Sequence, residues 1–407
     1  MTIKGLFKYI KDHAPQAVKN VEIDQLKGKR VAVDGNNFMY TAMAVARKEI
    51  VMATDLMNND PDVQAIRKKW FSSFCYFIQK WLKNGITPVI VFDSNDNVPK
   101  EKDGTREERR LEKEKRLQTI NQLKDELRNG DCLISSTQVL KNLQRALSNY
   151  NMIESNDYEN FRYCAVYTGV PIIIANGDGE KLCSMLAREG KVAAVFSADS
   201  DNLAYGCPYL IRKFENGMLQ MVILEEVLKS TKLSFSQFQD LAIISGCDYN
   251  ENLKGYAFMK CLKFFQKYGY IENIPLDFSP TNYIRCRELF KIESSYDCVE
   301  KQLHPAKIFE EYEKSENFES NDFNDFESND FKDVKSLNLN INKSALFLGR
   351  DEMERFECGH FVTPLLSLFE SLPEPNEDKW RPSFWDDNMF TKKVTLLPIP
   401  TLKVKVV

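Results

Sequence analysis

The sequence predicts an α/β domain built on a mainly parallel sheet, and three observations support this. Short apolar runs, such as "RVAV" before Asp34 and "PVIVF" before Asp93, have the length and composition of buried strands. Two more apolar runs, "PIII" and "KVAAVF", follow within residues 170–196. Helical stretches at 61–83 and 180–189 lie between these runs, and strands that alternate with helices are typical of parallel sheets.

Acidic residues stand where these predicted strands end. Ligands collect at the carboxyl ends of parallel strands, so several carboxylates there suggest a site. After "KVAAVF" come Asp199 and Asp201, and on a strand the side chains of i and i+2 point to the same face. Two such carboxylates repel each other unless a cation or protons compensate, although an ordinary surface turn would also explain them. The acidic candidates are Asp34, Asp93, Asp178, Glu180, Asp199, Asp201 and Asp248.

This set of acids favours magnesium. Mg²⁺ takes oxygen ligands and keeps several waters, so it suits a carboxylate cluster without histidine. The chain has 3 histidines and 10 cysteines without metal-site spacing, so we expect no structural zinc and mostly buried, reduced thiols. Two such ions, roughly 3.5–4 Å apart, can hold both the attacking and the leaving oxygen of a phosphodiester.

The overall composition predicts an intracellular protein with a sizeable core. The 407 residues, 43% of them hydrophobic, predict more than one lobe. No apolar run is long enough to span a bilayer, and the start "MTIKGLFKYIKDHAP" lacks the apolar region of a signal peptide. The net charge of −4 neither requires nor excludes nucleic acid, because it averages a cation-dense segment (100–116) with an acidic one (316–333).

In their order along the chain, these motifs resemble the flap endonucleases of the structure-specific 5′ nuclease (XPG/Rad-type) family. The resemblance begins at "MTIKGLFKYIKDHAP" and "GKRVAVDG" and continues through "VIVFDSNDNVPK" and "REERR". It then includes "ANGDGEKLCSMLAREGKVAAVFSADSDNLAYG" and "FQDLAIISGCDYNENLKG". It covers roughly the first 270 residues, far more than a single motif.

The resemblance implies a PIN-like nuclease core with a helical arch and a helix-hairpin-helix-like DNA-binding lobe. The near-repeat "FESNDF" in the divergent C-terminal region predicts a low-complexity, disordered segment. The expected divisions are the core in 1–99 and 151–234, the arch in 100–150, the lobe in 235–300, and the C-terminal region in 301–407 with low complexity at 313–340.

The resemblance also implies a reaction, the hydrolysis of a DNA phosphodiester near a junction of single and double strand. The seven acids would hold two magnesium ions, with manganese as a substitute. Lys100 and Arg106 match basic residues that reach the scissile phosphate, and Tyr40 matches the tyrosine on which a base stacks. The other implied DNA contacts are Arg47, Arg109, Arg110, Asp178, Gly246, Asp248, Gly255 and Lys260.

Several positions depart from the family pattern. Thr2 stands in place of a glycine, Phe77 in place of a DNA-contacting arginine, and Asp178 in place of a glutamate. In the hairpin "KGYAFMKC", Ala257 replaces the second glycine and Met259 replaces a base. The altered hairpin weakens the expectation of a monovalent cation at this turn.

Partners, location and alternatives complete the expectations. The resemblance implies flapped or branched DNA as substrate, a nuclear location and a sliding clamp as partner, although the tail has no Gln-x-x-apolar-x-x-aromatic-aromatic motif. No membrane partner is expected. The alternatives are a 5′–3′ exonuclease of the same family, a relative that prefers RNA, and a DNA-binding scaffold with a weakened active site. The spacing before Asp34 favours the flap branch, and the complete set of acids argues against the scaffold.

Overall fold

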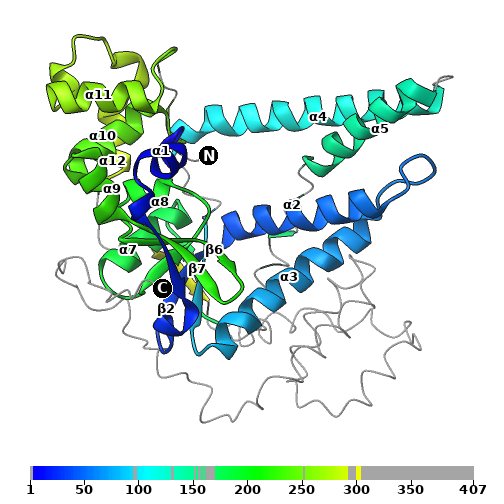
Figure 1. The fold of residues 1–407 in the computed structure, drawn as a ribbon, viewed down its shortest axis with the longest axis horizontal. Coiled ribbons are helices and arrows are strands. Elements are labelled where there is room, and N and C mark those ends of the chain that lie inside the picture. The colour runs from blue at the N-terminus through cyan, green and yellow to red at the C-terminus, as the bar shows by residue number, and fades with distance from the viewer. Residues whose placement is uncertain are drawn as a thin grey trace, which may run out of the picture.

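A computed structural model of the chain shows one sheet with helices on both faces, a projecting pair of helices and a small helical lobe (Figure 1). It describes residues 3–94, 99–129, 133–150, 153–154, 157–158, 161, 170–250, 253–291 and 299–303. Thr2 and the segment predicted to be of low complexity, 313–340, lie outside the described residues.

The sheet of the described residues has eight strands in the order β1-β7-β6-β5-β2-β3-β4-β8. Its five central strands pair in parallel, and antiparallel pairs form both edges. This confirms the mainly parallel sheet that the sequence predicts. The strands are Val18–Glu22 (β1), Arg30–Asp34 (β2), Thr87–Phe92 (β3), Ile172–Ala175 (β4), Ala194–Phe196 (β5), Tyr209–Glu215 (β6), Met218–Ile223 (β7) and Val299–Leu303 (β8).

The helices include the two predicted at 61–83 and 180–189, which correspond to α3 and α7. No helix of the described residues combines the length and apolar character needed to cross a bilayer. The α-helices are Leu6–His13 (α1), Gly35–Ala53 (α2), Val63–Lys83 (α3), Asp103–Asn129 (α4), Leu133–Ser148 (α5), Gly179–Arg188 (α7), Asp201–Ala204 (α8), Leu224–Thr231 (α9), Phe235–Ser245 (α10), Phe258–Tyr268 (α11) and Tyr283–Leu289 (α12). The 3₁₀ turns are Pro15–Ala17 (η1), Ile23–Leu26 (η2), Lys100–Lys102 (η3), Ile271–Asn273 (η4) and Ser279–Thr281 (η5).

Both faces of β2, β3, β4 and β5 are mostly buried, which explains why their sequences are nearly continuous apolar runs. Alternate residues point to opposite faces. In β2, Val31 and Val33 join one core cluster with α2 and α3, whereas Ala32 joins the other with α1, α7, α9, α10 and α11. The sheet is therefore the layer between two cores, and the acidic side chain of β2, Asp34, lies at the end of its strand.

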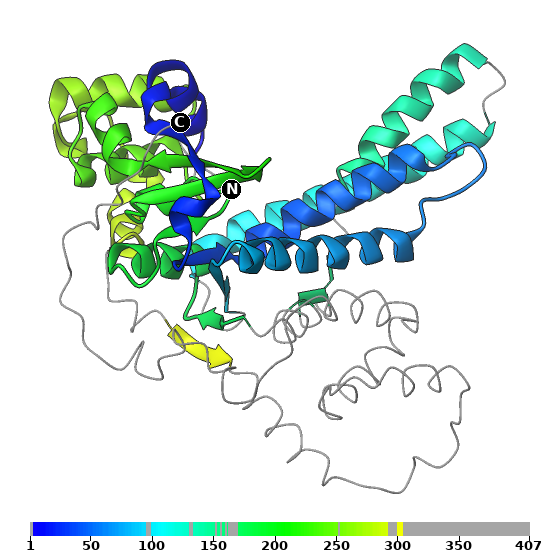
Figure 2. The same cartoon turned by 60° about the horizontal axis from the view of Figure 1, so that its bottom comes forward.

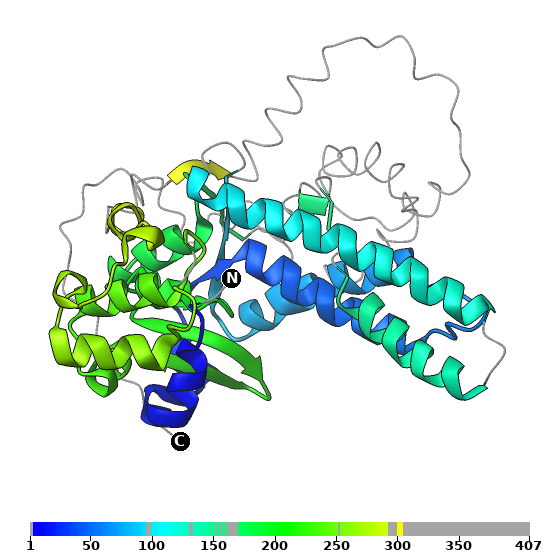
Figure 3. The ribbon, with the colours of Figure 1, turned by 90° about the horizontal axis from the view of Figure 1, so that it is seen from above.

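The long helix α4 and its partner α5 form an antiparallel hairpin that extends away from the sheet, on the same side as α2 and α3 (Figures 2 and 3). Helix α5 contacts both α4 and α2. A small apolar cluster that includes Val51, Ile120 and Leu143 joins the three helices. The base of the hairpin is the turn η3, which lies next to the ends of the central strands.

Candidate active site

Four neighbouring parallel strands bring the predicted acids to one edge of the sheet. Asp34 is the last residue of β2, Asp93 follows β3 directly, and Asp178 and Asp199 each follow the end of β4 and β5 by three residues. The order β5-β2-β3-β4 makes these strand ends adjacent. Asp248 enters from the loop after α10 and completes the group. The structure thus brings the predicted carboxylates into one cluster, which we call the acidic cluster.

Three members of the acidic cluster have the geometry of a metal site. Carboxylate oxygens of Glu180, Asp199 and Asp201 lie within 4.8 Å of one another. Asp201 is only 1% exposed, and neither of its carboxylate oxygens has a hydrogen-bond donor among the described residues. A buried carboxylate without a partner is costly, and a divalent cation removes that cost. The residues of this triad therefore fit a metal ion with oxygen ligands.

A turn, not a strand, aligns Asp199 with Asp201. Strand β5 ends at Phe196, so the explanation by i, i+2 alternation on a strand is wrong. The Oδ1 of Asp199 instead accepts a hydrogen bond of 3.0 Å from the backbone N–H of Asp201, where α8 begins. Ser197 Oγ accepts from the N–H of Asp199 and donates to Oδ2 of Asp34, both at 3.0 Å. This turn links the ends of β2 and β5.

Gly179 lets a helix start directly against Asp93. Its N–H donates to Oδ1 of Asp93 at 2.8 Å, while the Nδ2 of Asn36 donates to Oδ2 at 2.9 Å. A Cβ at position 179 would lie 2.9 Å from Oδ1 of Asp93, so a larger residue would push the carboxylate away. Glycine is therefore required here by close approach, and it brings the start of α7, with Glu180, to the cluster.

Burial and mutual repulsion raise the pKa values of the clustered acids. Burial, helped by Asp93 and Asp199, raises the pKa of Asp34 to about 7. Burial is also the main cause that raises the pKa of Asp93, Glu180, Asp199 and Asp201, and neighbouring carboxylates add to it. Without a metal ion, the cluster therefore favours bound protons, and a cation would compete with them.

Lys102 lies inside the acidic cluster, and the sequence reasoning missed it. Its Nζ is 2.5 Å from Oδ1 of Asp178 and 3.9 Å from Oε1 of Glu180. Burial opposes its charge, but Asp178, Glu180 and Asp93 together raise the pKa of Lys102 above its ordinary value. The one sequence feature that points to Lys102 is that it lies two residues after Lys100 in a run of charged residues. The sequence does not show which of the two lysines points into the cluster.

Two buried tyrosines, also missed by the sequence reasoning, hold Asp178 from the other side. The hydroxyl of Tyr249 donates to Oδ2 of Asp178, and the hydroxyl of Tyr205 bonds to that of Tyr249. Tyr249 directly follows Asp248, which is the one sequence signal for its position. This chain of contacts fixes the shorter carboxylate that stands where the resembled family has glutamate.

The two expected catalytic cations lie at the base of the α4–α5 hairpin. Lys100 is exposed at the first residue of η3, and Arg106 is exposed in the first turns of α4. Arg106 is close enough to Asp93 to oppose the rise in its pKa. Arg109, three residues on, places Nη2 3.0 Å from Oδ2 of Asp248. The catalytic roles of Lys100 and Arg106 stay predictions.

Among the expected DNA contacts, Tyr40, Gly255 and Lys260 are open to solvent and take part in no ion pair that the described residues show. Tyr40 is 43% exposed on α2, where its hydroxyl bonds to that of Tyr158. Gly255 is exposed with φ +85°, a conformation that favours glycine. Lys260 lies 3.7 Å from the ring centroid of Tyr256 and donates to the carbonyl of Gly255 at 3.4 Å. These positions leave a stacking surface on α2 and a small basic turn on the helical lobe.

Other expected contacts are engaged within the protein. Arg47 is 5% exposed, and its Nε donates to the carbonyl of Leu147 on α5. Arg110 is exposed but pairs with Glu107 and Glu114 on its own helix, and Gly246 is buried at the end of α10. Their contacts with DNA stay predictions. Phe77, where the family has an arginine, packs in the core with its ring centroid 4.5 Å from that of Phe38.

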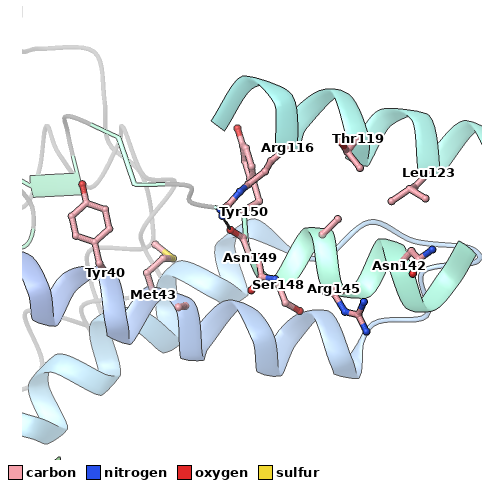
Figure 4. A pocket seen from close by; sticks show the side chains of 12 residues that line it. Tyr40, Met43, Arg116, Thr119, Leu123, Asn142, Arg145, Ser148, Asn149 and Tyr150 are labelled. Carbon is pink, nitrogen blue, oxygen red and sulfur yellow. Dashed lines mark hydrogen bonds between the residues drawn. The ribbon is translucent and has the colours of Figure 1, made fainter. Parts of the chain in front are cut away.

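A pocket of about 690 Å³ lies beside Tyr40, between α2, α4 and α5 (Figure 4). Two arginines, Arg116 and Arg145, and two tyrosines, Tyr40 and Tyr150, line it together with apolar side chains such as Met43. Figure 4 shows Tyr40 at one end of this pocket and the arginines on the α4–α5 hairpin. The pocket therefore offers aromatic and cationic groups on the hairpin side of the structure.

Comparisons with known proteins match this architecture to one family. Residues 1–116 match the XPG N-terminal domain, and residues 169–248 match the XPG I-region. The flap endonuclease 1 of Candida tropicalis is 31% identical over 67% of this chain and 70% of its own, and that of Lodderomyces elongisporus is 30% identical over 67% and 68%. The flap endonuclease 1 of Cryptosporidium muris is 30% identical over 71% of this chain and 62% of its own length.

A solved structure, the flap endonuclease-1 of Methanococcus jannaschii, is similar with a TM-score of 0.46 and 27% identity over 68% of this chain and 82% of its own. The two family regions coincide with the strands and the turns that carry the acidic cluster: Asp34 and Asp93 lie in the first, and Asp178, Glu180, Asp199, Asp201 and Asp248 lie in the second. The chain belongs to the flap endonuclease family of XPG-type nucleases.

Proposed function

We propose that this protein is a structure-specific 5′ flap endonuclease that hydrolyses DNA phosphodiesters near junctions of single and double strand. The observation that carries the proposal is the acidic cluster, in which the carboxylate of Asp201 accepts no hydrogen bond from any described residue. Buried carboxylates without enough cations destabilise a protein, so their presence is best explained by a bound ligand.

The ligand that suits the cluster is Mg²⁺. Glu180, Asp199 and Asp201 would hold one ion, and Asp34, Asp93, Asp178 and Asp248 supply the remaining carboxylates for a second. When bound, the two ions would generate the nucleophile from water and neutralise charge that develops on the phosphate. The all-carboxylate ligand set suits Mg²⁺ and Mn²⁺ alike, so the choice of Mg²⁺ rests on the family resemblance, with Mn²⁺ as a substitute.

The protein's own cations would act on the phosphate. Arg106, at the start of α4, is close enough to Asp93 to oppose the rise in pKa that burial causes in that acid, so its guanidinium group could approach a phosphate held by the cluster. We infer that Arg106 stabilises charge in the transition state and that Lys100, exposed on the same base, assists it. Both residues are placed by the hairpin, so the position of α4 would control the reaction.

The unpaired strand would lie along α2 and the hairpin. Tyr40 offers an exposed ring on which a base can stack, and the pocket beside it carries Arg145 for a backbone phosphate, whereas Arg116 is paired with Glu112. The exposed turn at Gly255 and Lys260 would contact the duplex on the other side of the cluster. This arrangement supports the proposed division into a core, an arch (100–150) and a DNA-binding lobe (235–300).

The biological setting follows from the relatives. They are named flap endonuclease 1, and we infer from them a role in DNA replication and repair, a nuclear location and a sliding clamp as a partner. The tail that would carry a clamp motif lies outside the described residues.

Cleavage of a labelled substrate tests the proposal. A 5′-labelled flap DNA, a blunt duplex of the same sequence and an RNA flap are incubated with the full chain, with Mg²⁺ and with chelator. We expect Mg²⁺-dependent release of the DNA flap, with slower removal of nucleotides from the blunt duplex. Equal or faster attack on the blunt duplex would identify an exonuclease instead. Tight binding of the flap without cleavage would identify a scaffold.

A further inference from the structure

The ammonium group of Lys102 is bound to Asp178, a carboxylate of the acidic cluster that a second metal ion would need as a ligand. Its Nζ lies 2.5 Å from Oδ1 of Asp178, and its side chain is only 14% exposed. The same Nζ lies 3.9 Å from Glu180, which also belongs to the metal triad. Glu180 is therefore near both Lys102 and the other two acids of the triad, whereas Asp178 is bound directly to Lys102.

The fold holds Lys102 in this position. In the turn η3, the neighbouring Glu101 points the other way and accepts a hydrogen bond of 2.8 Å from Nε of Arg285 on α12. The Nζ of Lys102 lies 5.1 Å from the ring centroid of Tyr249, whose hydroxyl donates to Oδ2 of Asp178. Thr105, one turn into α4, donates to the backbone carbonyl of Asp248 at 3.2 Å. The contact between Lys102 and Asp178 is therefore held by Glu101 before Lys102 and by Thr105 after it.

We propose that Lys102 is a built-in competitor of the second divalent cation. In the protein without DNA, the Glu180–Asp199–Asp201 triad takes one divalent cation while the Lys102 ammonium group neutralises Asp178. A second cation binds only when Lys102 leaves Asp178, because the ammonium group already occupies Oδ1 of that carboxylate and would add its charge to those of the two divalent cations. This inference rests on the proposed function, since it requires that the acidic cluster holds metal ions.

Counting bound Mn²⁺ in the absence of DNA tests the inference. Mn²⁺ is titrated into the full chain by isothermal titration calorimetry, and free Mn²⁺ is measured by electron paramagnetic resonance. The variants are Lys102→Met, Lys102→Gln and the charge-conserving Lys102→Arg. Lys100→Met is the matched control, because it removes the same charge two residues away at an exposed position. Circular dichroism checks that each variant is folded, and Lys102→Gln replaces Lys102→Met if the latter is not.

We expect one tightly bound Mn²⁺ in the natural protein and in Lys100→Met and Lys102→Arg. We expect a second Mn²⁺ in Lys102→Met and Lys102→Gln, bound at least about tenfold more tightly than in the natural protein. An unchanged second affinity in both neutral variants would overturn the inference and leave the proposed nuclease function standing. No Mn²⁺ binding at the cluster of the natural protein would overturn the metal site itself.

Discussion

Charges are arranged differently in the acidic cluster and in the helical hairpin. In the hairpin, Arg110 pairs with Glu107 and Glu114, and Arg116 pairs with Glu112, all at exposed positions one turn apart. Such pairs balance locally and contribute little to stability, about 0.3–0.5 kcal/mol each. In the cluster, acids from four strand ends are buried together, and the pKa values of five of them are raised. These paired charges of the hairpin are satisfied without a ligand, whereas the clustered acids need bound protons or a cation.

The largest expected effect comes from removing one charge of the triad. Asp201→Asn keeps the shape of the side chain but removes a metal ligand, so we expect the single-turnover rate of flap cleavage to fall by about 10³ or more. Flap binding, measured by fluorescence anisotropy in chelator, should stay equal or become tighter because a negative charge near phosphate is lost. A rate within tenfold of the natural protein at saturating Mg²⁺ would exclude Asp201 as a ligand.

The next largest effect separates two arginines of the same helix. Arg106→Ala should lower the single-turnover rate about 10²-fold and change the affinity for flap DNA less than about threefold. The reason is that we infer that Arg106 stabilises the transition state. The comparison is Arg109→Ala, whose partner is Asp248. If Arg106→Ala weakens affinity and leaves the rate at saturating protein unchanged, Arg106 only positions the backbone of the DNA.

The pKa of Asp34 predicts how stability depends on pH. Because its folded pKa is raised to about 7, the native metal-free protein holds this proton more tightly than the unfolded chain does. Its contribution to stability is therefore full below about pH 4 and is lost as pH rises through about 7. Asp34→Asn removes that loss. We expect it to raise the free energy of unfolding at pH 8 by roughly 2 kcal/mol, with little gain at pH 4.

Chemical denaturation in chelator at pH 4, 6 and 8 measures this difference. Asp34 caps α2, because its Oδ1 accepts a hydrogen bond from the N–H of Asn37. The control is Asp62→Asn, since Asp62 caps α3 in the same way at an exposed position away from the cluster. A gain for Asp34→Asn that is the same at all three pH values would show that its charge does not strain the fold.

The smallest expected effect lies in the hairpin. Arg110→Ala should change flap affinity and rate by less than about threefold, because its guanidinium group is already paired with two glutamates. Binding curves at low and at moderate salt measure it. A tenfold loss of affinity at low salt would show that Arg110 exchanges its glutamates for phosphate, as the family resemblance implies.

The positions of the acids could be predicted because they depend on short-range pattern and on one general rule. Apolar runs marked the strands, and the ends of parallel strands collect functional residues, so Asp34 and Asp93 were found from sequence. The proximity of Asp199 and Asp201 was predicted for the wrong reason, since they lie in a turn and not on a strand. The exact end of β5 depends on its pairing with β2 and β6, which the local sequence does not show.

Other features depend on contacts between residues that are distant in the sequence. Arg47 is buried because α5, a hundred residues later, packs over it, and no local pattern indicates this. Lys102 enters the cluster because η3 turns it inward while Glu101 faces α12. Tyr205 and Tyr249 come together only in the fold. Sequence alone therefore identified the carboxylates of the acidic cluster but not the residues that hold them.

A crystal of the full chain soaked in Mn²⁺ tests the central claim most directly, because the anomalous signal locates the ion without any assay of activity. We predict an anomalous peak within coordination distance of Glu180, Asp199 and Asp201, and its loss in Asp201→Asn. A saturating soak that leaves this triad empty, or a peak that persists there in Asp201→Asn, would contradict the claim that its buried carboxylates are paired by a metal ion.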